Sequence, residues 1–268
     1  MNNKVCIVTG ASSGIGLATA ELLVRNGYRV FGFSRSLVNT AGITELKVDV
    51  RDAKSVTDAV KQVQATAGRI DVLVNAAGYS ISGAIEESSI EQAKALFDTN
   101  LFGVAQLCRA VLPVMRQQKS GRIINISSLL GVMPSPLMGY YGASKHALEG
   151  YTGTLDHEVR AQGIRAIVIE AGFTKTRIVQ NMQRADTPVD VYKPIVQRFE
   201  AAIGKAIQTG AGPEGAAAVI LSAITARNPK PCYTVGAQIT LFSLLWRFMP
   251  RSLIDKALRK EFQLDKCD

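Results

Sequence analysis

The chain has 268 residues, of which 47% are hydrophobic and 20% charged, and its formal net charge is +9. This composition excludes a disordered or fibrous protein, and the length is ordinary for one α/β domain built on an extended sheet. The 31 basic residues are scattered, with no aromatic residues interleaved among them. We therefore expect anionic small ligands rather than a specific nucleic acid partner.

Cysteine and histidine usage argues against a metal centre or a disulfide framework. Cys6, Cys108, Cys232 and Cys267 lie far apart, no CxxC pair occurs, and the chain has only two histidines. We expect no bound metal and reduced thiols, as in a cytoplasmic protein. No run of 18 apolar residues occurs, and a strand-like run begins almost at the first residue. Neither a membrane span nor a signal peptide is therefore expected.

Short apolar runs, nearly continuous rather than alternating, recur along the chain and are typical of strands buried on both faces of a parallel sheet. The expected strands are Lys4–Thr9, Arg29–Ser34, Thr44–Asp49, Ile70–Asn75, Arg122–Ser127 and Ile164–Glu170. Helices are expected at Gly14–Asn26, Ala53–Thr66, Ile90–Gln117 and Tyr140–Ala161. This alternation predicts an α/β fold: a single doubly wound, Rossmann-type domain over residues 1–268, with a parallel sheet of about seven strands and helices on both faces.

Local signals mark two helix ends. Gly27 stands where a left-handed residue is expected to end the first helix. Asp52 can cap the second helix, and Lys54 and Asp58 lie one turn apart on its surface.

A glycine-rich loop, Thr9-Gly10-Ala11-Ser12-Ser13-Gly14-Ile15-Gly16, joins the first strand to the first helix. Gly10 permits a tight turn, Gly14 lets the backbone approach a pyrophosphate, and Gly16 lets the helix pack close to the strand. The N–H groups at the helix start would then face the phosphates. In this position the loop predicts a dinucleotide site, and a glycine-rich turn without a ligand is the alternative.

Further motifs follow in order along the chain: Asn75-Ala76-Ala77-Gly78, Asn100, Ser128 and Tyr141-Gly142-Ala143-Ser144-Lys145. With the glycine-rich loop, this series resembles the short-chain dehydrogenase/reductase family, closely from about Lys4 to Thr176. The chain departs from the family pattern twice. Ala76 stands where a second asparagine is usual, which would loosen a link to the neighbouring strand, and Ala171-Gly172 stands where Pro-Gly is frequent, which gives a less rigid turn.

The resemblance implies a nicotinamide dinucleotide cofactor and assigns residues to it. Asp49 would accept from the adenine amino group, Asn75 and Gly78 would pass the adenosine ribose, and Gly172 and Thr176 would contact the nicotinamide. The full expected set is Gly10, Ser12, Ser13, Gly14, Ile15, Gly16, Ser34, Arg35, Asp49, Val50, Asn75, Ala76, Gly78, Tyr141, Lys145, Gly172, Phe173, Thr174 and Thr176.

The end of the second strand predicts NADP rather than NAD. A carboxylate at this point of the fold would bind both ribose hydroxyls, whereas an arginine attracts a 2′-phosphate. Arg35 occupies the place, no acid follows before Glu45, and Ser12, Ser34 and Ser36 can add hydroxyl donors. A solvated surface arginine is the alternative interpretation.

Helical spacing selects the catalytic tyrosine. At about 100° per residue, Lys145 lies roughly 40° round the helix from Tyr141 but about 140° from Tyr140. Because nearby positive charge favours the phenolate, we expect Lys145, together with the oxidised nicotinamide, to lower the phenol pKa of Tyr141. The resemblance implies that Tyr141 exchanges the proton, that Ser128 rather than Ser127 binds the substrate oxygen, and that Lys145 also holds the nicotinamide ribose. It further implies that Asn100 kinks its helix and holds a water on the way to Lys145.

The expected reaction is hydride transfer between NADP and the carbonyl or secondary alcohol of a bulky apolar substrate. The expected catalytic set is Asn100, Ser128, Tyr141 and Lys145, with Ser128 and Tyr141 touching the substrate. Apolar loops at Tyr79–Ser88 and Leu129–Gly139 and a lid at about residues 173–209 would form the pocket. The resemblance is to hydroxysteroid, retinol and acyl-chain reductases, and it does not choose among them.

The tail, at about residues 239–268, is the least family-like segment. An apolar run from Ile239 ends before Pro250, and the helix after it has an apolar stripe with Lys256, Arg259 and Lys260 on its other face. Two readings remain open: it covers the sheet edge or a subunit interface, or it walls the substrate pocket and docks on a membrane surface. The resemblance also implies a homodimer or homotetramer. A non-catalytic NADPH-sensing regulator is the alternative function, and the intact tyrosine–lysine pair argues against it.

Overall fold

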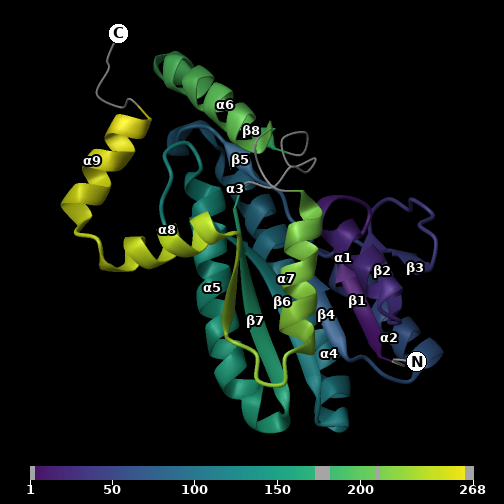
Figure 1. The fold of residues 1–268 in the computed structure, drawn as a ribbon. Coiled ribbons are helices and arrows are strands. Elements are labelled where there is room, and N and C mark those ends of the chain that lie inside the picture. Colours follow the sequence, from purple (N-terminus) through teal and green to yellow (C-terminus); the bar gives the residue numbers. More distant parts are fainter. Residues whose placement is uncertain (1–3, 173–181, 209–211, 263–268) are drawn as a thin grey trace.

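The computed structural model describes residues 4–172, 182–208 and 212–262 (Figure 1). Its centre is a seven-stranded sheet in the order β3-β2-β1-β4-β6-β7-β9, and every pair of neighbouring strands is parallel. The strands are β1 Val5–Thr9, β2 Arg29–Ser34, β3 Ile43–Lys47, β4 Val72–Asn75, β6 Gly121–Ser128, β7 Ile164–Ala171 and β9 Cys232–Val235. The doubly wound α/β fold expected from the sequence is confirmed.

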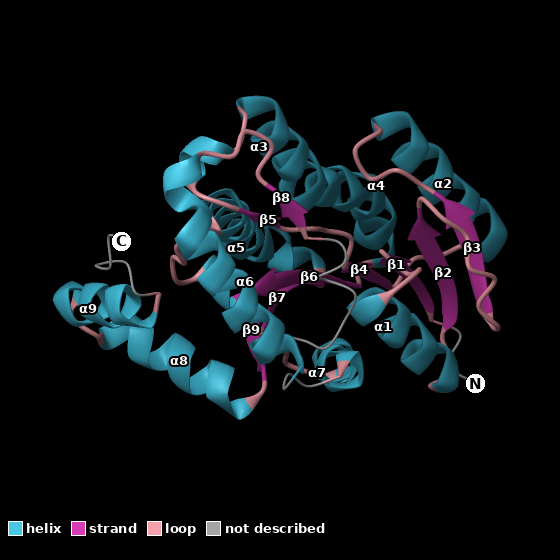
Figure 2. Cartoon of the chain, turned by 90° about the horizontal axis from the view of Figure 1, so that it is seen from above, coloured by secondary structure: helices cyan, strands magenta, loops and turns pink. Residues whose placement is uncertain are grey.

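Helices cover both faces of this sheet, as Figure 2 shows from above. One face packs against α1 (Gly14–Arg25) and α7 (Pro213–Thr225) through a buried apolar cluster that includes Leu23 and Ile220. The other face packs against α2 (Ala53–Ala67), α4 (Gly103–Gln118) and α5 (Gly139–Val159). Burial on both faces explains why the strands read as continuous apolar runs.

The expected helix over Ile90–Gln117 is not continuous. It divides into α3 (Ile90–Phe97), a π-helical turn at Asp98–Phe102, and α4. A π turn inserts an extra residue per turn and re-aims the side chains that follow it. The interruption includes Asn100, where the family resemblance implies a kink.

Other boundaries differ from expectation by a few residues. The third strand spans Ile43–Lys47 rather than Thr44–Asp49, so Asp49 lies in the loop beyond the sheet. Gly27 ends the first helix region with a φ of 77°, and the Asp52 side chain caps α2 by accepting from Lys54 N at 2.9 Å, both as expected.

Several further elements were not predicted as such, although the helix expected after Pro250 is present as α9 (Arg251–Glu261). A short parallel pair, β5 (Ile81–Ser82) and β8 (Gln183–Arg184), precedes α6 (Lys193–Gln208), which covers the carboxyl ends of the strands (Figure 1). After β9 the chain leaves the sheet as α8 (Ala237–Phe248) and α9. In the described ranges, none of these helices has the length and apolar character needed to cross a bilayer.

Candidate active site

The loop between β1 and α1 has the backbone that the glycine pattern predicts. Gly10 and Gly14 have φ angles of 65° and 56°, a region that L side chains rarely adopt. A Cβ atom on Gly16 would overlap the carbonyl oxygen of Gly10. The loop therefore lies directly on the first turn of α1, which brings the backbone N–H groups there to a point where a pyrophosphate fits.

The start of α1 leaves these N–H groups open to a ligand. Ser13 is the N-cap residue in an extended conformation, and its side chain makes no capping hydrogen bond. The first turn contains no acidic residue. An unscreened helix N-terminus favours an anion, so the residues present fit a dinucleotide phosphate.

Side chains tie this loop to the neighbouring strand ends. Thr9 Oγ1 accepts from the backbone N–H groups of Ala76 and Ala77 at 3.1 and 3.0 Å. Asn75 Nδ2 donates to Asn125 Oδ1 at 2.8 Å, which links β4 to β6 despite Ala76. The Asn75 side chain is therefore directed into the core, and only backbone at this position faces the sheet edge where a ribose would pass.

The end of β2 and the loop after β3 form a basic corner. Arg35 is exposed, and its positive charge is close enough to Asp49 to stabilise the carboxylate. The guanidinium of Arg51 donates to both carboxylate oxygens of Asp49, at 3.0 Å from Nε and 2.6 Å from Nη2. The hydrogen bond from Arg51, aided by the charge of Arg35, lowers the pKa of Asp49. Sequence reasoning assigned Asp49 to adenine and missed Arg51, whose role depends on the fold of this loop.

Glu45, the first acid after Arg35, does not face this corner. Its carboxylate accepts from the backbone N–H groups of Val38 and Thr40, each at 2.7 Å. These hydrogen bonds hold the loop between β2 and β3 and lower the pKa of Glu45. No carboxylate therefore replaces Arg35 at the end of β2.

Tyr141 and Lys145 lie one turn apart on the buried face of α5. The Lys145 ammonium is 5.8 Å from the centroid of the Tyr141 ring, and it donates to the backbone oxygen of Ile126 at 2.8 Å. The Ser128 hydroxyl hydrogen-bonds Tyr141, whereas Ser127 lies on the other side of the strand. Tyr140 is half-buried and lines a separate hollow with Ile85 and Tyr192.

Burial dominates the titration of both groups. It raises the pKa of the Tyr141 phenol, and the hydrogen bond with Ser128 only partly offsets this. It lowers the pKa of Lys145 to about 8, while the carboxylate of Glu149 acts in the opposite direction. In the protein without cofactor the pKa of Tyr141 is thus raised, because the loss of water around the buried phenol dominates.

Asn100 connects the π-helical turn to the same residues. Its Nδ2 donates to the backbone oxygen of Tyr79 at 3.0 Å and to Ser144 Oγ at 3.2 Å, and its Oδ1 accepts from Tyr79 N. A Cβ atom on Gly78 would lie 3.0 Å from Asn100 Oδ1 and 3.9 Å from Lys145 Nζ. The structure therefore brings Asn100, Lys145, Tyr141 and Ser128 to one place, at the carboxyl ends of β4 and β6.

The surroundings of Tyr141 are apolar. Tyr141 belongs to a buried cluster with Met138 and with Phe199 and Ile203 of α6. Phe262, directly after α9, packs against this cluster, and its ring lies 5.9 Å from that of Phe199. Sequence reasoning placed the lid in this region but could not pair Phe199 with Phe262, because no local pattern joins residues so distant along the chain.

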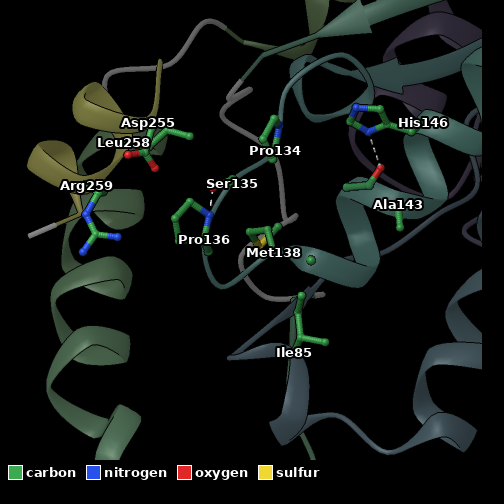
Figure 3. A pocket seen from close by; sticks show the side chains of 12 residues that line it. Ile85, Pro134, Ser135, Pro136, Met138, Ala143, His146, Asp255, Leu258 and Arg259 are labelled. Atoms are coloured by element: carbon green, nitrogen blue, oxygen red, sulfur yellow. Dashed lines mark hydrogen bonds between the residues drawn. The ribbon is translucent and has the colours of Figure 1, made fainter. Parts of the chain in front are cut away.

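A cavity of about 490 Å³ separates α9 from the segment that leads into α5 (Figure 3). Ile85, Pro134, Pro136 and Met138 line one wall, and Leu258 of α9 lines the other. The tail therefore lines this cavity, whereas Ser128, Tyr141 and Lys145 are not among its lining residues.

Among the other expected cofactor residues, Ser12 and Ile15 are half-buried, Val50 is buried, and Ser34 Oγ donates to the backbone oxygen of Ser36. Gly172 packs against Ile239 of α8, whereas Phe173, Thr174 and Thr176 lie outside the described residues.

Known proteins are similar to this chain in sequence and in fold. The short chain dehydrogenase family model matches residues 4–187. A 3-ketodihydrosphingosine reductase of Bacteroides thetaiotaomicron is 37% identical over 97% of this chain and 98% of its own. An NADPH-dependent 3-dehydrocapnine reductase of Ornithobacterium rhinotracheale is 29% identical over 97% of this chain and 98% of its own.

Solved structures agree with the sequence comparison. A short-chain dehydrogenase/reductase from Burkholderia phymatum, crystallised in complex with NAD, superposes with a TM-score of 0.79 at 25% identity, over 90% of this chain and 92% of its own. With the matched family model and the relatives, this shows that the chain is an oxidoreductase of a family that binds nicotinamide cofactors, and that it belongs to the short-chain dehydrogenases/reductases.

Proposed function

We propose that this protein is an NADP-dependent reductase of long-chain apolar ketones. The observation that carries the proposal is the arrangement of Lys145 and Ser128 around the buried Tyr141, inside an apolar cluster. An acid–base pair at the carboxyl ends of parallel strands, beside a dinucleotide loop, suits hydride transfer to a carbonyl carbon.

Each side chain has one task in this reaction. Tyr141 keeps its proton at neutral pH, because burial raises its pKa, and gives it to the carbonyl oxygen as negative charge develops there. Ser128 donates a hydrogen bond to the same oxygen. The positive charge of Lys145 stabilises the phenolate that remains. Asn100 holds a water near Lys145, on the route by which a proton returns to Tyr141. When bound, the nicotinamide cofactor supplies the hydride.

The basic corner supports NADP as the cofactor. Arg35 and Arg51 both act on Asp49, so two guanidinium groups stand where a 2′-phosphate would lie. The nearest alternative acid, Glu45, is engaged by backbone N–H groups. The 3-dehydrocapnine reductase relative is NADPH-dependent by name, which agrees with this choice.

The walls of the pocket and the names of the relatives support a long-chain ketone. Phe199, Ile203 and Phe262 enclose the Tyr141 side in apolar surface. Two relatives are named as reductases, one of 3-ketodihydrosphingosine and one of 3-dehydrocapnine, which favours reduction over alcohol oxidation. We propose a substrate of the same kind, with its keto group at Tyr141 and its chain along the cavity beside α9.

Assembly and location follow the same line of inference. We propose a homodimer or homotetramer through the α3–α4 and α5 helices, on which Ile90 and Phe102 are exposed. We place the enzyme in the cytoplasm, with peripheral contact to membranes through Leu241, Phe248 and Leu253, which are exposed on or beside α8 and α9.

NADPH consumption with a panel of ketones tests the function. We expect turnover that rises with the length of the apolar chain, and much slower turnover when NADH replaces NADPH. Tight NADPH binding with no turnover of any ketone, aldehyde or alcohol would instead support the NADPH-sensing regulator.

Shortening Phe262 to alanine tests the role of the tail in the pocket. The substitution removes the ring that covers Phe199, so we expect kcat/KM for a long-chain ketone to fall about tenfold, roughly the effect of two lost methylene contacts. A short ketone should react at the wild-type rate. Leu253→Ala, an exposed change on α9, the helix that precedes Phe262, is the control. Equal losses for both ketones in Phe262→Ala would restrict the tail to a structural role.

A further inference from the structure

A group of buried polar side chains lies behind Lys145, and the proposed reaction does not use it. Ser127 of β6 and Glu170 of β7 are direct partners in the register of the two strands, so their side chains leave the sheet on the same face. Asn125, two residues before Ser127, bonds Thr152 of α5, so this face looks toward α5. The thiol of Cys232 on β9 donates to Glu170 Oε1 at 3.2 Å.

Glu149 approaches this group from α5, one turn after Lys145. A Cβ atom on Gly131 would lie 2.5 Å from Ser127 Oγ and 3.0 Å from Glu149 Oε1, so both oxygens converge on this glycine. Glu149 Oε1 and Glu170 Oε2 are buried, and Glu170 Oε2 has no hydrogen-bond partner among the described residues. No salt bridge reaches either carboxylate in the same ranges.

The two acids and the lysine are electrostatically coupled. Burial raises the pKa of Glu149 to about 7; the Ser127 hydroxyl lowers it, the charge of Glu170 raises it further, and Lys145 lowers it. Glu149 in turn raises the pKa of Lys145, which burial lowers to about 8. Burial also raises the pKa of Cys232, so its thiol stays neutral. Among the described residues, the ionisable groups that face Glu149 are therefore Lys145, Glu170 and Cys232.

We propose that Glu149 is a positioning residue of the reaction, which keeps Lys145 charged, and that Glu170 determines at which pH Glu149 becomes able to do so. The inference rests on the proposed function, in which the Lys145 charge stabilises the Tyr141 phenolate. Below neutral pH, Lys145 holds its charge unaided. Above it, the ionised Glu149 offsets the burial that would otherwise remove the proton from Lys145.

Substitutions of the two glutamates should shift two different titration midpoints, both to lower pH. Glu149→Gln keeps the shape but removes the charge, so Lys145 should lose its proton at a pH lower by about half a unit to one unit. Glu170→Gln removes the negative charge that opposes the ionisation of Glu149. Glu149 should therefore ionise at lower pH, while Lys145 loses its proton at the same pH as in the wild type. Glu158→Gln, an exposed acid on the same helix, should change neither.

NMR titration of the full chain, labelled at lysine Cε and glutamate Cδ, measures these midpoints without any turnover. The signals are assigned by their loss in Lys145→Arg and Glu149→Gln, and thermal melts of each variant verify folding. An unchanged Lys145 midpoint in folded Glu149→Gln would overturn the proposal. So would a Glu149 midpoint that does not fall in Glu170→Gln.

The pH profile of ketone reduction adds a catalytic readout. If the pKa of Lys145 falls by one unit in Glu149→Gln, the ratio of kcat at pH 9 to kcat at pH 7 should fall about fivefold. A profile that matches the wild type in shape would contradict the positioning role. If the wild type reduces no ketone, the proposed function fails, and the NMR midpoints still decide whether Glu149 and Lys145 are coupled.

Discussion

Tyr141→Phe should lower kcat/KM for the ketone by about 10²- to 10⁴-fold, while the Kd for NADPH stays within about twofold of the wild type. The variant keeps the ring that packs against Met138 and Phe199, so the fold and the pocket remain. It removes only the hydroxyl that Ser128 contacts and that transfers the proton. Steady-state kinetics and NADPH fluorescence titration measure the two quantities separately.

Tyr140→Phe is the matched control, because it makes the same chemical change one residue away. Tyr140 faces the hollow beside Ile85 rather than Lys145, so its variant should react within about twofold of the wild type. Similar losses in both variants would contradict the assignment of Tyr141 from the helical face. A Tyr141→Phe enzyme with wild-type kcat would remove the phenol from the mechanism altogether.

Arg35→Asp should reverse the cofactor preference. The wild type is expected to use NADPH with a higher kcat/KM than NADH, and the variant should lower the ratio of the two values by about 10²- to 10³-fold. The physical reason is the loss of a charged hydrogen-bond partner together with the gain of a carboxylate that repels the 2′-phosphate. The ratio is measured with one ketone at saturating concentration.

Lys61→Glu provides the control for net charge. Lys61 is exposed on α2, and its variant changes the charge of the protein by the same two units. It should leave the ratio unchanged. A wild type that already prefers NADH would refute the NADP assignment. A preference for NADPH that survives Arg35→Asp would assign the phosphate contact to Arg51 instead.

The sheet was predictable because each strand carries its own evidence. Runs such as Val5–Thr9 are apolar on both faces and alternate with helices along the chain, so the type and the parallel direction of these strands follow from local sequence. The same holds for Tyr141 and Lys145, whose spacing of one helical turn fixes a shared face. The short β9 strand, with four residues, has too little pattern to be recognised alone.

Other parts depend on contacts between distant segments. Nothing near Arg51 indicates that its guanidinium would bind Asp49 beside Arg35, because the loop geometry decides it. In the sequence, Glu149 is one of several polar residues on a long helix. Only the register of β6 with β7 shows that Glu170 lies beside Ser127, on the face of the sheet toward α5. The break at Asn100 was expected only from the family resemblance, since Asp98–Phe102 has no proline or glycine that would mark it locally.

The place of β9 has a consequence for how the chain acquires its structure. This strand completes the sheet against β7 through Val168–Cys232 and the pairs that follow, yet the lid region, α6 and α7 separate it from β7 in the sequence. Until β9 docks, β7 presents an unpaired parallel edge of apolar residues, and such an edge recruits strands from other chains. During synthesis, the ribosome must release β9 before that edge can close. We therefore expect a variant with weakened β9 pairing to aggregate at a lower protein concentration than a variant with substitutions on the exposed surfaces of α8 and α9.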